Sequence, residues 1–188
     1  YEQLYKLTKG SLTVLIGHTM EEAGYDASYS LVTREMHKPP TWSDALVYKF
    51  PTLTLKQKVL LDVGALGKGY LIDIISDLLL LHGIKRFCVD AGGDLICKNL
   101  EESEKLRVGL EDPRDVTKAI GIVELQNKAL CGSAGNRRTW GDFHHIINPH
   151  TLTSPRNILA TWVIAERALL ADGLASALFF TDPAVLTP

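Results

Sequence analysis

The sequence comprises 188 residues, of which 46% are hydrophobic and 22% are charged, and its formal net charge is −2. This composition is typical of a globular protein with a buried core, and the length predicts a single domain over residues 1–188. The small negative charge gives no electrostatic reason to expect nucleic acid or an anionic membrane surface as a partner.

Short elements are predicted along the first third of the chain. In chain order they are a helix over 2–8 that stops at Gly10, loops and short helices over 11–44, and a pair of strands over 45–50 and 52–62 that bends near Pro51. The helix follows from apolar spacing, the loops from glycines and a Pro-Pro pair, and the strands from runs of strand-forming residues.

The clearest helix is predicted at residues 65–81. Apolar residues recur there at steps of three and four, and His82-Gly83 ends the pattern. Strands are then predicted over 86–91, 94–99, 105–110, 119–125, 128–132, 143–147 and 158–165, and a final helix over about 166–180. Runs of strands with a few helices predict an α+β fold rather than alternating βαβ units.

Neither a membrane segment nor a cysteine-based site is predicted. The longest apolar run, from Leu71 to Leu81, is interrupted by polar residues and is too short for a transmembrane segment. No signal peptide or lipid-attachment cysteine is visible at the start. Three cysteines without CxxC spacing argue against a disulfide scaffold and a zinc site, so Cys88 and Cys97 are interpreted as small buried hydrophobic residues.

A glycine-rich turn, DVGALGKGY over residues 62–70, joins a strand to the long helix. Glycines let the backbone approach a ligand, and unpaired amides at a helix start favour an anion such as a phosphate. Lys68 adds a positive charge. The segment matches neither the dinucleotide-binding nor the P-loop pattern, so by itself it favours a structural turn.

Two carboxylates bracket a Gly-Gly pair in Asp90-Ala91-Gly92-Gly93-Asp94. The pair predicts either a hairpin turn between two strands or backbone that lies close to a ligand, and by itself it favours the hairpin.

Adjacent histidines, His144 and His145, follow a polar turn that begins at Ser133. Since neighbouring residues of a strand face opposite sides, at most one of them points easily into a given site. A histidine with a near-neutral pKa suits general-base work on a hydroxyl, whereas the alternative is an exposed histidine beside a partly buried one.

Asp172 and Ser176 are four residues apart in the final predicted helix and therefore share one of its faces. A carboxylate and a hydroxyl on one face offer two hard oxygen ligands to Mg²⁺. The alternative is a surface aspartate beside a serine that bonds to the helix backbone.

Taken together and in this order, the segments resemble the FAD:protein FMN transferase family, also called the ApbE family. The resemblance runs from about Tyr5 to Phe180. The matching segments are DxGxxxKGY at 62–70, AGGD at 91–94, SxxxRR at 133–138, HHII-x-P at 144–149 and ADxxA[ST]A at 171–177.

The resemblance implies an ApbE-like fold, with mixed or antiparallel sheets flanked by a few helices, from which this chain lacks the N-terminal part. It implies that FMN passes from FAD to a threonine or serine hydroxyl of an acceptor protein and that AMP leaves. It implies Mg²⁺ held by Asp172, Ser176 and the main-chain carbonyl near Ala65. The residues implied to contact FAD are Gly64, Ala65, Lys68, Gly92, Gly93 and Ser133.

The resemblance also implies the catalytic residues. His145, in preference to His144, would take the proton from the attacking hydroxyl, and Lys68 would steady the phosphates or nearby flavin groups. Asp62 and Asp94 are expected to shape their loops rather than to react.

Two departures from the family pattern bear on activity. Asn148 stands where the family has an aspartate, which removes a charge that could orient the histidine. Leu152 stands where the family has a glycine, which loses a glycine conformation. Two alternative functions stay open. The sequence barely separates transfer from hydrolysis of FAD to FMN and AMP in the same site, and the two departures motivate non-catalytic binding of FAD. The compartment, cytoplasmic or exported, is also left open.

Overall fold

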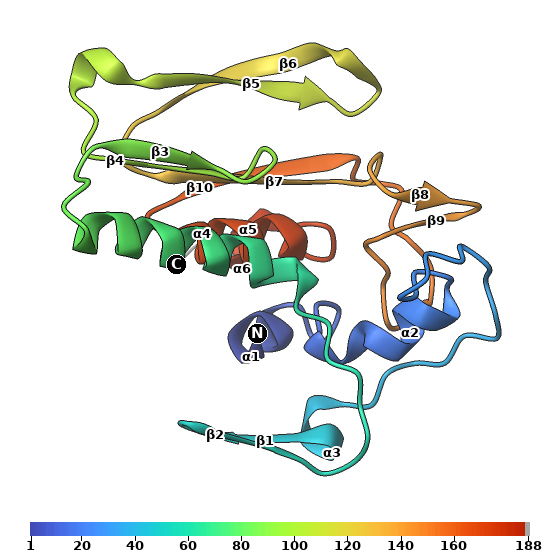
Figure 1. The fold of residues 1–188 in the computed structure, drawn as a ribbon. Helices are drawn as coiled ribbons and strands as arrows, with labels where there is room; N and C mark the ends of the chain where they lie inside the picture. The colour runs from blue at the N-terminus through green and yellow to red at the C-terminus, as the bar shows by residue number, and fades with distance from the viewer. Residues whose placement is uncertain (187–188) are drawn as a thin grey trace. The chain divides into compact units, whose positions relative to one another are not determined.

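The computed structural model of the protein describes residues 1–186. Its chain forms two compact units. Unit 1 contains Tyr1–Val63, Arg137–Arg156 and the described residues from Phe180 onward, whereas unit 2 contains Gly64–Asn136 and Asn157–Phe179. The chain therefore leaves unit 1 and returns to it twice, which can be followed along the colours of Figure 1.

Unit 2 combines two α-helices with a four-stranded sheet and a separate hairpin (Figure 1). Its elements are α4 (Gly64–Leu81), β3 (Phe87–Asp90), β4 (Leu95–Lys98), the 3-10 helix η2 (Glu102–Glu104), β5 (Leu106–Asp112), β6 (Asp115–Leu125), β7 (Ala129–Ala134), β10 (Ala160–Ala165) and α5 (Ala168–Ala177). The sheet has the strand order β10-β7-β4-β3, and β5 pairs with β6. Each of these pairings is antiparallel, which confirms the predicted α+β class.

The sheet of unit 2 buries apolar side chains on both of its faces. On one face, Ile96 packs with Ile72 of α4 and Ala171 of α5. On the other face, Cys97 packs with Leu125 of the β5–β6 hairpin. Because successive residues of a strand point to opposite faces, a strand such as β4 supplies both cores. Helices thus cover one face of the sheet and the hairpin covers the other, as Figure 1 shows.

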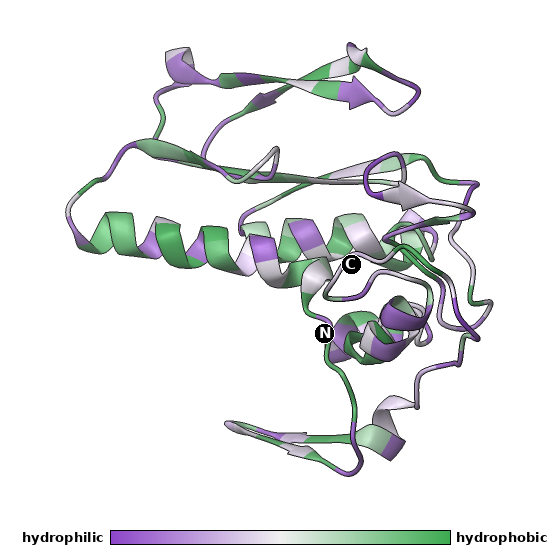
Figure 2. Ribbon diagram, turned by 45° about the vertical axis from the view of Figure 1, so that its right-hand side comes forward, coloured by the Kyte–Doolittle hydropathy of each residue, from purple (hydrophilic) through white to green (hydrophobic). Residues whose placement is uncertain are grey.

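Helix α4 confirms the helix predicted over 65–81, although the apolar residues that define the periodicity are largely exposed. Ile74, Leu78 and Leu81 are 38%, 48% and 80% exposed, whereas Gly69 and Ile72 are buried. Figure 2 accordingly shows hydrophobic colour along most of the helix. The buried face contains Gly69, which lets α5 approach the α4 backbone closely.

The interpretation of Cys88 and Cys97 as two free buried residues is wrong, since they form a disulfide. Strands β3 and β4 are joined by a tight hairpin, and its register places the two cysteines directly opposite each other. Cys88 is exposed and Cys97 is fully buried. A spacing rule based on CxxC misses this pair, because pairing across a hairpin depends on the strand register. Cys131 is a buried free thiol.

Unit 1 holds short elements around two apolar clusters. Its elements are α1 (Glu2–Leu7), the 3-10 helix η1 (Val14–Ile16), α2 (Gly17–Glu22), α3 (Trp42–Ala45), β1 (Leu46–Lys49), β2 (Thr52–Leu55), β8 (Thr139–Trp140), β9 (Phe143–His144) and α6 (Pro183–Leu186). The Trp140 ring stacks on Tyr25 with centroids 5.5 Å apart, and its Nε1 donates to the carbonyl of Ala23 at 2.7 Å. This tryptophan thereby ties residues of the 137–156 segment to the N-terminal part of unit 1.

Two strand boundaries and one helix in unit 1 differ from the sequence prediction. The strand expected over 143–147 ends at His144, because the amide of Ile146 donates to the ring Nδ1 of His144 instead of to a neighbouring strand. The strand expected over 52–62 ends at Leu55, which pairs with Leu46, the first residue of its four-residue antiparallel partner β1. Helix α6 was not predicted, although Pro183 occupies a first helical position, where proline is favoured.

Among residues 1–186, no helix combines the length and the apolar character that crossing a bilayer requires.

Candidate functional site

Helices α4 and α5 of unit 2 lie in very close contact at Gly69. A Cβ added at Gly69 would overlap the carbonyl of Ala168 and would lie 2.8 Å from the Cβ of Asp172. The Gly69 amide donates to Oδ2 of Asp172 at 2.9 Å. The glycine therefore brings a carboxylate of α5 onto the backbone of α4, within the glycine-rich turn that the sequence singled out.

Asp172 is a buried carboxylate, with a side chain that is 3% exposed. Burial raises its pKa to about 6, and the charge of Asp94 adds to the increase, while the Gly69 amide and Lys68 oppose it. Among the described residues, its hydrogen bonding uses Oδ2, so Oδ1 is left for another partner.

Ser176 lies one helical turn after Asp172 on α5 and is 8% exposed. Its Oγ lies 3.4 Å from the carbonyl oxygen of Ala65 and 3.3 Å from Oγ of Ser133. Ala65 belongs to the first turn of α4, and Ser133 belongs to β7. Three segments that are distant in the sequence therefore bring oxygen atoms together at Ser176, one helical turn from Asp172.

The charge of Lys68 is paired with that of Asp94. Its Nζ forms an ion pair with Oδ2 of Asp94, and Oδ1 of Asp94 accepts the amide of Gly132 at 3.0 Å. Asp94 is 1% exposed, whereas the Lys68 side chain is 45% exposed. Asp94 thus connects Lys68 of α4 to the backbone of β7, which is consistent with the expected structural role of this residue.

The Gly92-Gly93 pair forms the turn of the β3–β4 hairpin. Both residues have positive φ, 72° and 96°, a conformation that L side chains rarely adopt. The amide of Gly93 donates to Oδ1 of Asp90 at 2.8 Å, and the amide of Ala91 donates to the carbonyl of Asp94 at 2.9 Å. A Cβ at either glycine would meet nothing within 4 Å, so the conformation, and not a close backbone neighbour, requires glycine here.

The two histidines of unit 1 have different surroundings. His144 is 5% exposed, its Nδ1 accepts the amide of Ile146 at 3.2 Å, and its Nε2 lies 2.8 Å from the carbonyl of Pro155. This arrangement places the ring proton on Nε2, and burial lowers the pKa of His144. His145 is partly exposed, and its Nδ1 lies 3.2 Å from the carbonyl of Arg137, which places the proton on Nδ1 and the lone pair on Nε2.

Comparison with known proteins decides the family. The model of the ApbE family matches residues 2–186. The chain belongs to the ApbE family. The resemblance inferred from the five ordered segments is thereby confirmed.

Curated relatives of this ApbE chain carry the name FAD:protein FMN transferase. The relative from Rhodobacter capsulatus is 26% identical over 184 residues, which cover 91% of this chain and 35% of the relative. The relative from Vibrio cholerae is also 26% identical, over 94% of this chain and 57% of the relative. The chain thus spans between about a third and three fifths of the length of these two relatives.

Solved structures of ApbE proteins share the fold. The ApbE protein of Thermotoga maritima superposes with a TM-score of 0.81 at 24% identity, over 95% of this chain and 62% of that chain. The flavin transferase ApbE of Vibrio cholerae superposes with a TM-score of 0.76 at 23% identity, over 98% of this chain and 63% of that chain.

The oxygen atoms gathered on this ApbE chain suit a hard divalent cation. One carboxylate, two hydroxyls and a main-chain carbonyl are ligands that Mg²⁺ accepts in proteins. No group of three or more His, Cys, Asp or Glu side chains that could hold a metal ion occurs among the described residues.

The two departures from the family pattern have structural counterparts. Oδ1 of Asn148 accepts the amides of His150 at 2.8 Å and Thr151 at 3.4 Å, so its side chain forms a local turn. Leu152 has a φ of 58°, the left-handed conformation that a glycine adopts at no steric cost. Leu152 therefore adopts the backbone conformation for which a glycine is favoured, although it carries a side chain.

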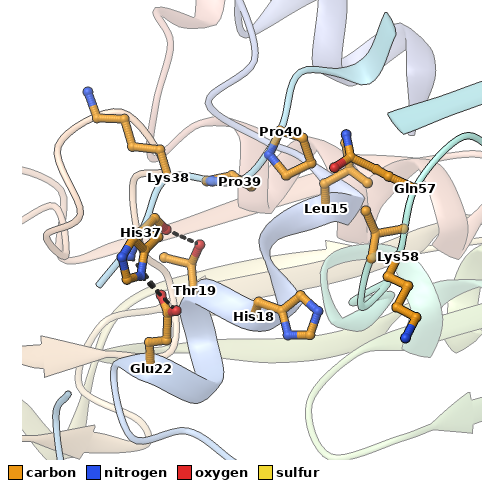
Figure 3. A pocket seen from close by; sticks show the side chains of 11 residues that line it. Leu15, His18, Thr19, Glu22, His37, Lys38, Pro39, Pro40, Gln57 and Lys58 are labelled. Carbon is orange, nitrogen blue, oxygen red and sulfur yellow. Dashed lines mark hydrogen bonds and ion pairs between the residues drawn. The ribbon is translucent and has the colours of Figure 1, made fainter. Parts of the chain in front are cut away.

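Unit 1 also contains a pocket that the sequence did not predict. It has a volume of about 240 Å³ and is lined by Leu15, His18, Thr19, Glu22, His37, Lys38, Pro39, Pro40, Gln57, Lys58 and Val59. Figure 3 shows the contact between His37 and Glu22, in which the ring Nδ1 lies 3.0 Å from Oε1. The hydrogen bond to Glu22 raises the pKa of His37. No sequence pattern marked this pocket, because residues of η1 and α2 meet the loop segments around 37–40 and 57–59 only in the fold.

Proposed function

We propose that this chain transfers FMN from FAD to a threonine or serine hydroxyl of an acceptor protein, in a Mg²⁺-dependent reaction that releases AMP. The observation that carries the proposal is the set of oxygen atoms at Ala65, Ser133, Asp172 and Ser176. The name of the curated relatives, FAD:protein FMN transferase, supports the same activity.

Asp172, Ser176 and the carbonyl of Ala65 are the residues that we expect to hold Mg²⁺. When bound, the ion would neutralise charge on the pyrophosphate oxygens of FAD and orient them for in-line attack. Asp172 must be ionised to bind the ion, and a pKa of about 6 leaves it mostly ionised at neutral pH.

Gly64, Ala65, Lys68, Gly92, Gly93 and Ser133 are the residues that we expect to contact FAD. Gly64 and Ala65 open helix α4, and the positive end of the helix dipole there favours the pyrophosphate. Lys68 adds a positive charge whose position is fixed by its ion pair with Asp94.

In the proposed reaction, the acceptor hydroxyl oxygen bonds to the phosphorus on the FMN side of the pyrophosphate. The bond from that phosphorus to the bridging oxygen breaks, and AMP leaves with that oxygen. The proton of the hydroxyl passes to Nε2 of His145, whose lone pair is set by the contact between Nδ1 and the carbonyl of Arg137.

The test is to incubate the protein with FAD, Mg²⁺ and a flavin-acceptor protein. Flavin fluorescence on the acceptor in a denaturing gel, together with AMP released in equal amount, is the expected result. Asp172→Asn should remove both signals while the circular dichroism spectrum stays that of the wild type. Full labelling by Asp172→Asn would contradict the metal assignment.

Two other functions give different results in the same experiment. Hydrolysis of FAD by water would release FMN and AMP without labelling the acceptor. Non-catalytic binding, which the departures at Asn148 and Leu152 favour, would leave FAD intact after long incubation.

A further inference from the structure

Helix α5 begins without a side-chain cap of its own. Its N-cap residue, Arg167, makes no capping hydrogen bond. Asp73 of α4 supplies the acceptors instead. Its Oδ1 accepts the amide of Ala168 at 2.9 Å, and its Oδ2 accepts the amide of Leu169 at 3.0 Å and Nε of Arg167 at 3.2 Å. Asp73 is 2% exposed, and both of its carboxylate oxygens accept hydrogen bonds. The start of α5 is therefore bound to α4 by a buried carboxylate.

A second carboxylate makes the reverse connection. Asp172 of α5 accepts the amide of Gly69 of α4 at 2.9 Å. Gly69 and Asp73 are four residues apart on α4, and Ala168 and Asp172 are four residues apart on α5, so each pair spans one helical turn. Each helix therefore gives one carboxylate to backbone amides of the other helix. We refer to Gly69, Asp73, Ala168 and Asp172 as the crossed brace.

The apolar part of this contact does little to fix how far α5 lies along α4. The residues that α5 buries here are small, as with Ala168 and Ala171, and apolar burial is not directional. Hydrogen bonds to the amides of Ala168 and Leu169 require donor and acceptor within about 3 Å and in line, so they do fix that position.

We propose that Asp73 is a positioning residue for the metal site. Asp73 fixes the position of α5 along α4, so that Asp172 and Ser176 of α5 face Ala65 of α4. It acts through the crossed brace rather than by contact with the ion or FAD. This role rests on the proposed function.

The first variants compare Asp73 with a matched neighbour. Asp77 lies one turn further along α4, its side chain is 71% exposed, and its Oδ2 lies 3.7 Å from the Arg167 guanidinium. Asp73→Ala should weaken Mg²⁺ binding, measured by calorimetry in the presence of FAD, by about tenfold or more, which is the usual effect of losing support behind a metal ligand. Asp77→Asn should bind Mg²⁺ like the wild type.

A second variant separates positioning from simple stabilisation. Arg167 has φ −128° and ψ 142°, the extended conformation of an N-cap residue. In Asp73→Ala/Arg167→Ser, the new serine can cap α5 from within its own chain segment but cannot bind α5 to α4. We expect this double variant to regain resistance to urea relative to Asp73→Ala while its Mg²⁺ binding stays weakened. Arg167→Ser alone is the control for the loss of the arginine.

Amide hydrogen exchange at Gly69 gives a readout without metal or FAD. Exchange should be faster in Asp73→Ala/Arg167→Ser than in the wild type, because the hydrogen bond to Asp172 depends on the position of α5. Wild-type Mg²⁺ affinity and wild-type Gly69 protection in the double variant would overturn the proposal. If the wild type itself binds no Mg²⁺, the proposed function fails, whereas faster Gly69 exchange in the double variant would still support positioning.

Discussion

The carboxyl group of Asp172 is buried away from solvent. Burial raises its pKa to about 6, so the folded protein holds a proton there at a pH at which the unfolded chain has released it. A bound cation would reverse this effect, because it favours the ionised form of its ligand.

The free energy of unfolding of the metal-free protein should depend on pH because of the raised pKa of Asp172. Since the folded pKa is raised from 3.8 to about 6, the free energy of unfolding should fall as the pH rises between those two values. The loss should be roughly 2–3 kcal/mol from this group. Urea denaturation at a series of pH values measures it, and the Asp172→Asn variant should lack this component. An identical pH dependence in the two proteins would contradict the assignment.

The adjacent histidines should have separable roles. His145→Gln should reduce flavin transfer by about a hundredfold or more, the usual contribution of a general base, with little change in stability. His144→Ala should destabilise the fold by about 1–3 kcal/mol, because it leaves the Ile146 amide and the Pro155 carbonyl without their partner. Transfer assays and urea denaturation of both variants test this division, and each variant serves as the control for the other.

At the scale of the elements, the contact between α4 and α5 depends on Gly69. Gly69→Ala places a methyl group against the carbonyl of Ala168 and the Cβ of Asp172, so the helices must separate. We expect a loss of about 1–3 kcal/mol in the free energy of unfolding, together with weaker Mg²⁺ binding. Gly109→Ala is the control, because its new Cβ would lie 3.5 Å from Ala119, an ordinary contact. Equal behaviour of the two variants would argue against the close contact.

The disulfide belongs to the hairpin that carries Asp94. Cys88 and Cys97 are nine residues apart, and a loop of this size predicts a stabilisation of roughly 2–3 kcal/mol relative to the reduced chain. Urea denaturation with and without a thiol reductant should show this difference. Cys88→Ser should be insensitive to the reductant, since it has no disulfide to reduce and its two thiols, Cys97 and Cys131, are both buried.

At the scale of the whole molecule, the residues of the proposed metal site all belong to unit 2. Ala65, Ser133, Asp172 and Ser176 lie within Gly64–Asn136 and Asn157–Phe179. Added alone, Mg²⁺ should therefore slow amide exchange in α4 and α5 more than in α1 and α2 of unit 1. Hydrogen exchange followed by mass spectrometry measures this, and Asp172→Asn should abolish the difference. Uniform protection of both units would contradict a site confined to unit 2.

Local sequence determined most of the helices and strands. The periodicity over 65–81, the Gly-Gly turn at 92–93 and the strand runs on either side of it appear where expected, because each depends on interactions within a few residues. The end of β9 at His144 was not predictable in this way, since a side chain competes there for a backbone amide.

For the candidate site, too, some features could be predicted from local sequence and others only from the tertiary structure. The order of five short segments was sufficient to indicate the ApbE family. The spacing of Asp172 and Ser176 predicts a magnesium site, which stays a prediction. Only the tertiary structure revealed that Asp73 caps α5 from another helix, that Asp94 holds Lys68, and that Cys88 pairs with Cys97. These contacts join residues far apart in the chain or opposite each other across a hairpin, and their partners are set by helix packing and strand register, which local pattern does not encode.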